Sequence, residues 1–273
     1  MNRFILVSPS DAPSHGLATP AGSDYGKKLI SQFNLLGKIK LETEINQLPR
    51  NLILTAETLS RTLLAKSLGL KIQSPIEIYS SLSGQSFPEN KSTYGHHILV
   101  PYFIEDVDKA RLATLLFSLR KLNLHNYTFT LLARTSKLNW YKIFLAKISR
   151  IETNLVIGNL SFDNYSKLFT SVDSVLFLET KLYNTHSSGK ALDAICLRIP
   201  ALTASGTYHH KIYEKWVPGI PSYRDKSDFL QCFAMWKQIH ESIKIELVKN
   251  NDLIQNSYSP SRYFEDLFAL FEN

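Results

Sequence analysis

The stretch that most constrains the fold is residues 172–205, in the second half of the chain. Its pattern predicts a buried strand over 174–178, a polar loop over 179–188, a helix over 189–197 and a second buried strand over 201–204. A strand, a helix and another strand in this order form the βαβ unit of a parallel sheet. The stretch therefore predicts an α/β protein whose strands run in parallel.

The polar loop inside this unit is a candidate binding site. Open parallel sheets bind their ligands beyond the carboxyl ends of the strands, where this loop begins. Its backbone N–H groups and the N-terminus of the following helix suit an anion such as a phosphate. The same composition is also typical of a plain surface turn, so both interpretations stay open. The residues that define the loop are Thr185, His186, Ser187, Ser188 and Gly189.

A boundary divides the chain after residue 80. Residues 80–95 are rich in Ser, Gly and Pro and show no apolar period, which places a linker over 81–96. The linker separates a small α/β unit, residues 1–80, from a larger one, residues 97–249. Strands are expected in the small unit at 4–7, 52–55 and 76–79, with a helix at 56–68.

The larger unit continues the alternation of strands and helices with short connections. This order favours a doubly wound parallel sheet. A tail over 250–273 is expected to hold a loop at 250–260 and a helix at 261–271. The remaining strands are expected at 97–101, 127–133 and 154–157, and the remaining helices at 104–123, 137–147, 162–169 and 226–249.

Charge and composition limit the classes of partner that the chain is expected to bind. The net charge of +7 and the pI of about 9.2 favour anionic partners such as nucleotides or an anionic membrane face. No Lys/Arg run dominates, so no nucleic-acid stripe is expected. Cys196 and Cys232 fall in helical patterns and read as reduced core residues. We expect a soluble cytoplasmic protein, with peripheral contact to the inner face of a membrane left open.

Two runs carry a resemblance to a known family. FDNYSKLFTSVDSVLFLETKLY, followed by SSGKALDAICLRIPALTAS, resembles the C-terminal donor-binding domain of glycosyltransferases of the GT-B fold, including capsule-type transferases. The family has a helix of the form Leu-Glu-Ala followed by Gly-x-Pro-Val. Here the matching residues are Leu192, Asp193 and Ala194, and then Pro200. The short helix before the strand is matched by Tyr165, Leu168, Phe169 and Asp173.

The resemblance implies a fold and an activity. The fold would be α/β with two Rossmann-like domains of parallel sheets, of which the N-terminal one is small or truncated. The activity would be transfer of a sugar from a nucleotide-sugar donor to a glycan or lipid-linked saccharide, as in polysaccharide biosynthesis. The family usually works without a bound metal, and no cofactor is implied.

The resemblance also implies roles for individual residues in the donor site. Cations and helix N-terminal amides would meet the charge on the leaving phosphate, and Asp193 would accept a hydrogen bond from a ribose or sugar hydroxyl. Each residue also has an ordinary structural interpretation, such as a solvated loop charge or a helix cap. The donor-binding candidates are Arg134, Lys137, His186, Ser187, Ser188, Gly189, Lys190 and Asp193.

An inverting transferase also needs a base to deprotonate the acceptor hydroxyl. Asp11 and His15 follow the first expected strand, on the side where the donor would lie. Aspartate and histidine side chains can both take up that proton. Asp11 and His15 are therefore the candidate catalytic residues.

The sequence departs from the family at three places, which keeps other functions open. The family's upstream glutamate would fall near Asn184, Asp193 is a shorter acid than the usual glutamate, and Arg198 replaces a small residue. The Ser-Ser-Gly turn also resembles sugar-nucleotide epimerases of the same architecture. The alternatives are such an epimerase, or a GT-B-like module that binds a nucleotide or glycan without turnover.

No metal site is expected. The Asp-x-Asp pattern at Asp106 and Asp108 directly precedes an expected helix, where acids are favoured by the helix dipole. The adjacent histidines, His96 with His97 and His209 with His210, would point to opposite faces of a strand. The chain has no Cys/His spacing typical of zinc sites.

Overall fold

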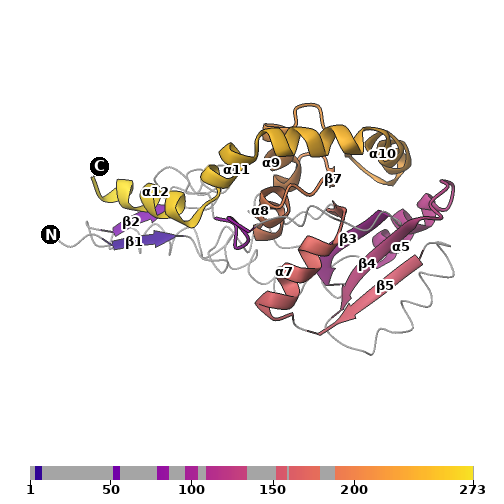
Figure 1. Ribbon diagram of the computed structural model, residues 1–273, viewed down its shortest axis with the longest axis horizontal. Coiled ribbons are helices and arrows are strands. Elements are labelled where there is room, and N and C mark those ends of the chain that lie inside the picture. The colour runs from indigo at the N-terminus through magenta and orange to yellow at the C-terminus, as the bar shows by residue number, and fades with distance from the viewer. Residues whose placement is uncertain are drawn as a thin grey trace, which may run out of the picture. The chain divides into compact units, whose positions relative to one another are not determined.

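The computed structural model divides the chain into two compact units. The first contains residues 1–79, 180–189 and 258–273, and the second contains residues 80–179 and 190–257. No helix in the described part of the chain is long and apolar enough to cross a membrane. The structure describes residues 4–7, 52–55, 79–85, 96–103, 109–133, 152–158, 160–178 and 188–272 (Figure 1).

The first unit contains a parallel pair of strands and the last helix. Strand β1 (Phe4–Val7) pairs in parallel with β2 (Leu52–Thr55), as the sequence predicts. Helix α12 (Pro260–Glu272) begins one residue before its expected start. The helix expected at 56–68, and most of the strand expected at 76–79, lie outside the described residues.

The second unit is built on a parallel sheet of six described strands, in the order β5-β4-β3-β6-β7-β8. Counted along this unit, the order is that of a Rossmann fold, with a switch point between β3 and β6. The prediction of a parallel α/β sheet is confirmed. The strands are β3 (His96–Phe103), β4 (Tyr127–Ala133), β5 (Glu152–Ile157), β6 (Ser174–Leu176), β7 (Ala201–Ala204) and β8 (Ser222–Tyr223).

The central strands form because their apolar residues come in unbroken runs. Every residue of β6 and β7 is buried, and so are the last five residues of β4. Strands buried on both faces show such runs, because helices cover both sides of a parallel sheet. Their core side chains, which are at most 1% exposed, include Ile98, Leu99, Phe129, Leu131, Val175 and Leu202.

Three helices of the second unit begin at polar caps. Ser161 caps α7, Thr207 caps α9, and Asp225 with Asp228 forms a capping box at the start of α10. Each cap satisfies N–H groups that would otherwise lack an intrahelical partner. The helices are α5 (Lys109–Leu119), α7 (Phe162–Ser171), α8 (Gly189–Cys196), α9 (Tyr208–Trp216), α10 (Lys226–Lys249) and α11 (Asn251–Ser257).

The structure corrects three expectations. The loop expected at 250–260 is largely helix α11, whose Ile254 is fully buried and donates its N–H to the Asn250 carbonyl at 2.9 Å. Helix α9 and strand β8 were not expected. The helix expected at 104–123 ends earlier, at Leu119, and the one expected at 137–147 lies outside the described residues.

Helix α8 ends in a Schellman motif. The N–H of Ile199 donates to the Ala194 carbonyl and that of Arg198 donates to the Ile195 carbonyl, both at 2.9 Å. Arg198 occupies the position where glycine is usual and has a φ of 56°. Its guanidinium donates to Asn251 of α11 at 3.2 Å. This turn sends the chain directly from α8 into β7.

Candidate functional site

The candidate site lies at the carboxyl edge of the six-stranded sheet, at the switch point between β3 and β6. Tyr102 stands near the end of β3. The chain leaves β6 and enters α8 at Gly189 and Lys190, while the chain leaving β7 enters α9 at Tyr208. Because the strands are parallel, these three places share one edge of the sheet, where α/β proteins bind ligands.

Three side chains meet at this edge. The Lys190 ammonium lies 5.3 Å from the centroid of the Tyr102 ring, within the range of a cation–π contact. The Tyr102 hydroxyl lies 3.1 Å from Nε2 of His209. The His209 ring stacks on Phe177, with the two ring centroids 4.3 Å apart. Residues from strand β3 and from helices α8 and α9 thus bring Lys190 next to the aromatic rings of Tyr102 and His209.

The positive charge in this group belongs to Lys190. Burial and, to a smaller extent, the nearby charge of Lys190 lower the pKa of His209 to about 3. His209 is therefore neutral at physiological pH. An ammonium at the carboxyl edge of a parallel sheet suits an anionic ligand.

The start of α8 adds backbone donors to the same place. An N-terminal turn of a helix presents N–H groups and the positive end of the helix dipole. Apart from its own helix and chain neighbours, no described residue has a heavy atom within 4 Å of a Cβ built on Gly189, so none of them blocks close approach to the backbone there. Ser188, directly before it, is buried. Ser188, Gly189 and Lys190 were all predicted as donor-binding residues, and that role remains a prediction.

Asp193, another predicted donor-binding residue, is held by the protein itself. Its Oδ1 accepts hydrogen bonds from the Ser80 hydroxyl at 2.8 Å and from the Leu82 N–H at 3.1 Å. Its Oδ2 accepts one from the Tyr165 hydroxyl at 2.7 Å. The Ser81 hydroxyl lies 3.1 Å from Oδ1 and 3.0 Å from Oδ2. Whether Asp193 also contacts a ribose remains a prediction.

The other predicted site residues lie outside the described residues. Their roles remain predictions as well. They are Asp11, His15, Arg134, Lys137, His186 and Ser187.

Sequence reasoning missed Tyr102 and His209. His209 was considered only as half of a histidine pair and a poor metal site. A usable signal was its place in the chain, because Thr207 and His209 follow the buried strand β7 and therefore lie at the carboxyl edge. Tyr102 follows the apolar run of β3 in the same way.

A cluster of histidines lies at the opposite edge of the sheet, where β3 and β6 begin. Nε2 of His96 lies 2.7 Å from the Ser174 hydroxyl, and Nε2 of His240 lies 2.8 Å from the same oxygen. A hydroxyl has one proton, so at least one of the two rings donates to it. His97 bonds instead to Thr130, at 2.6 Å. Among the described residues, no group of three or more His, Cys, Asp or Glu side chains could hold a metal ion.

Comparison with known proteins gives matches in structure alone. No protein-family model matches the sequence, and no curated protein does. TarM of S. aureus superposes with a TM-score of 0.59 at 13% identity, over 93% of this chain. WaaG, a glycosyltransferase involved in lipopolysaccharide biosynthesis, superposes with a TM-score of 0.58 at 15% identity, over 88% of this chain. A glycosyltransferase from Rickettsia africae is 12% identical, with a TM-score of 0.52 over the full chain.

These structures differ in how much of their own length is matched. The chain spans less than half of TarM, at 47%, and of an O-GlcNAc transferase from Thermobaculum terrenum, at 44%. It covers 70% of WaaG and 98% of the Rickettsia protein. The shared feature is the fold. The chain has the α/β GT-B fold of glycosyltransferases, with parallel sheets in both units, which confirms the resemblance read from the sequence at the level of fold.

Proposed function

We propose that the protein is a glycosyltransferase that moves a sugar from a nucleotide-sugar donor to a glycan or lipid-linked saccharide. The observation that carries this proposal is Lys190, which stands over Tyr102 at the switch point and beside the N-terminal turn of α8. A cation next to helix N–H groups matches the diphosphate of a sugar nucleotide. The shared GT-B fold supports the same class of reaction.

The proposed reaction breaks the bond between the sugar and the phosphate. Negative charge then develops on the leaving diphosphate, and fixed donors aimed at such charge are often the largest source of rate enhancement. Lys190 and the N–H groups from Ser188 to Lys190 would supply that stabilisation without a metal ion. Arg134, Lys137, His186 and Ser187 would complete the donor site.

The acceptor hydroxyl must lose a proton as it attacks the sugar. Asp11 and His15 remain our candidates for the base that takes it. An imidazole or a carboxylate would then hold the proton until it is released to water. The proposed class of acceptor is supported by the likeness to WaaG, a glycosyltransferase involved in lipopolysaccharide biosynthesis.

Donor binding tests the proposal directly. We expect UDP, or another nucleoside diphosphate, to raise the melting temperature of the protein, because a ligand bound to the folded state stabilises it by mass action. Lys190→Ala should weaken the apparent affinity about tenfold, the usual scale for one charge-assisted contact. A thermal-shift assay measures the melting temperature, and isothermal titration calorimetry measures the dissociation constants. The titration uses the full chain.

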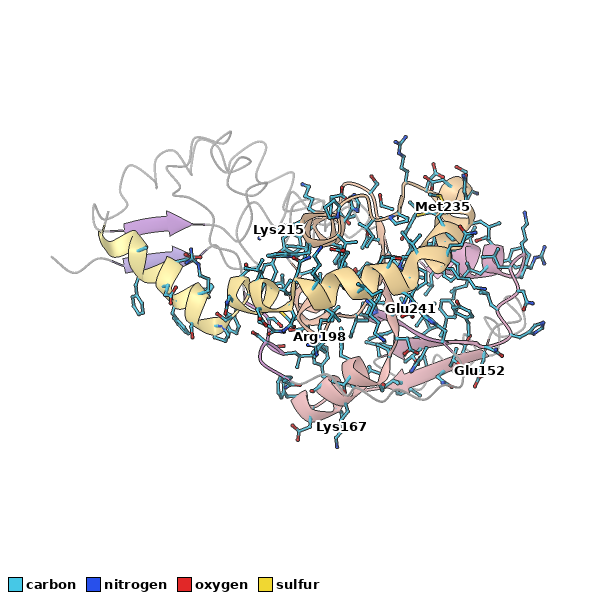
Figure 2. The ribbon with its side chains drawn as sticks, turned by 45° about the horizontal axis from the view of Figure 1, so that its top comes forward. Glu152, Lys167, Arg198, Lys215, Met235 and Glu241 are labelled. Atoms are coloured by element: carbon cyan, nitrogen blue, oxygen red, sulfur yellow. The ribbon has the colours of Figure 1, made fainter. Side chains whose placement is uncertain are left out.

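Lys167→Ala is the matched control. Lys167 is exposed on α7 and projects from the second unit into solvent (Figure 2), so its removal should leave the affinity unchanged. If no nucleoside diphosphate binds the unaltered protein, the donor-site proposal is wrong. If a donor binds, incubation with sugar nucleotides separates the functions. Transfer to an acceptor supports the transferase, interconversion without an acceptor indicates the epimerase, and binding without turnover indicates a binding module.

A further inference from the structure

The polar turn at residues 80–85 is fixed to the second unit by its own donors and acceptors. Its first three residues bond to Asp193, as described above. The Ser83 hydroxyl and the Gly84 N–H both donate to Oε1 of Gln255, at 3.1 and 2.8 Å. The Ser166 hydroxyl of α7 donates to Gln85 at 2.6 Å. The turn therefore has a defined position on the unit that carries the candidate site.

Asp193 is the point where this turn, α7 and α8 meet. The turn supplies three donors to its carboxylate, and Tyr165 of α7 supplies the fourth. An ionised carboxylate has room for about four such bonds. Asp193 is only 3% exposed, so these partners take the place of water around the charge. The carboxylate therefore has about its full number of hydrogen bonds without a ribose hydroxyl.

Tyr165 is a permanent hydrogen-bond donor to the Asp193 carboxylate. Burial raises the pKa of the Tyr165 hydroxyl well above its usual value, and the Asp193 charge and hydrogen bond raise it further. The tyrosine therefore stays protonated and keeps donating across the physiological range. A buried charge costs free energy unless it is paired and hydrogen-bonded, so losing any one of these donors should loosen the arrangement.

Asp193 lies on the same short helix as the proposed donor contacts. Helix α8 has eight residues, and Lys190 precedes Asp193 by three positions, less than one turn. A movement of the helix at Asp193 therefore moves the N-terminal turn and the root of the Lys190 side chain. Displacements of about 1 Å in groups that orient a reactant are costly for binding and rate.

We propose that Asp193 is a positioning residue. It fixes α8 against the turn at 80–85 and α7, and so sets the position of Lys190 and of the helix N–H groups at the donor diphosphate. It does not contact the donor, in contrast to the ribose contact predicted from the sequence. This inference rests on the proposed donor site and names the residues that hold that site in place.

The test compares UDP with its 2′-deoxyribose counterpart, dUDP, by calorimetry on the full chain. We expect Asp193→Asn to weaken both ligands about tenfold and to leave the ratio of their dissociation constants unchanged. Tyr165→Phe, which removes a donor to Asp193 and no ligand contact, should weaken both ligands in the same direction. In the double variant the losses should not add, because both changes break one network.

Thr170→Ala is the matched control on α7. The Thr170 hydroxyl donates to two carbonyls of its own helix, at 3.0 and 3.1 Å, and is not among the donors to Asp193. Its removal should leave the affinity for UDP unchanged. If Asp193→Asn does not fold, Tyr165→Phe alone decides, because it keeps the shape of the side chain.

Two results would overturn the inference, and they are distinguishable. In the first, Asp193→Asn alters the ratio of the UDP and dUDP dissociation constants, whereas Tyr165→Phe keeps the ratio of the original protein. This result would show a direct ribose contact and would leave the donor site in place. Absence of any nucleoside diphosphate binding in the unaltered protein would remove the donor site itself, and the positioning role with it.

Discussion

At the scale of single residues, Arg198 combines a local cost with a local gain. Its φ of 56° lies in the left-handed region, which costs a residue with a side chain about 1–2 kcal/mol. The hydrogen bond from its guanidinium to Asn251 offsets part of this free-energy cost. The sequence already marked Arg198 as a departure from the family pattern, and the backbone explains why a small residue is usual there.

Two substitutions separate these effects. Arg198→Ala removes the hydrogen bond and keeps a Cβ at positive φ, whereas Arg198→Gly removes both the hydrogen bond and the strain. We expect the glycine variant to be more stable than the alanine variant by about 1 kcal/mol. Urea unfolding of the two proteins measures this difference. Equal stabilities would mean that the backbone at Arg198 carries no strain.

His209 makes stability depend on pH. Its pKa falls from 6.5 in the unfolded chain to about 3 in the fold, because it is buried and lies near Lys190. The folded state therefore favours the neutral ring. The stabilisation is fully present above pH 6.5 and is lost as the pH falls toward 3, by up to about 1.4 kcal/mol per pH unit.

His209→Gln should reduce that slope. We expect the free energy of unfolding to fall less between pH 7 and pH 5 in this variant than in the unaltered protein, as measured by urea titrations at both values. Some slope should remain, because burial also lowers the pKa of His210 and of His240. A variant with an undiminished slope would show that His209 titrates normally in the fold.

At the scale of elements, helix α10 illustrates what a cap contributes. Asp225 accepts the Ser227 N–H at 2.6 Å, and Asp228 accepts the N–H groups of Arg224 and Asp225. Asp225→Ala should lower the free energy of unfolding by about 1 kcal/mol. Thermal unfolding followed by circular dichroism measures the loss. Gln238→Ala, at an exposed position in the middle of α10, is the comparison and should change stability little.

Elements were predictable where local pattern and burial agree. The runs in β4 and β7, and the apolar period of α10, reproduce their observed bounds. Helix α9 was missed because its buried residues include Tyr208, His209 and Tyr213, which carry polar atoms and hide the apolar period. Strand β8 has two residues and exists through its pairing with β7, which no local pattern encodes.

The candidate site was also predictable only in part, because no local pattern encodes its long-range contacts. The place of α8 and Lys190 followed from the order of strand, loop and helix. The partners of Asp193 did not follow, because Ser80 lies 113 positions away in the sequence. The turn at 80–85 was interpreted as linker from its polar composition, yet its Leu82 is fully buried. Contacts over such distances are set by packing of the whole unit.

At the scale of the whole molecule, two units each draw on segments that are distant in sequence. The first unit joins the N-terminal residues to 180–189 and to the C-terminal residues 258–273. The second unit carries the full Rossmann strand order and the group of Lys190, Tyr102 and His209. The sequence order of strands and helices predicts the class of fold, whereas the assignment of the tail to the first unit depends on contacts between segments distant in sequence.

The parallel sheet described above has a consequence for how the chain reaches its native state. Strands β3 and β6 are neighbours, yet the bond from the His97 N–H to Asp173 beside them joins residues 76 positions apart. Pairings of this kind close large loops before they bring any gain, so they form late and slowly. During synthesis on the ribosome, β3 emerges long before β6, so the apolar side chains of β3 that pack near β6 stay exposed until β6 is made. Chaperones that shield such faces would therefore matter more for this protein than for a helical bundle of the same length.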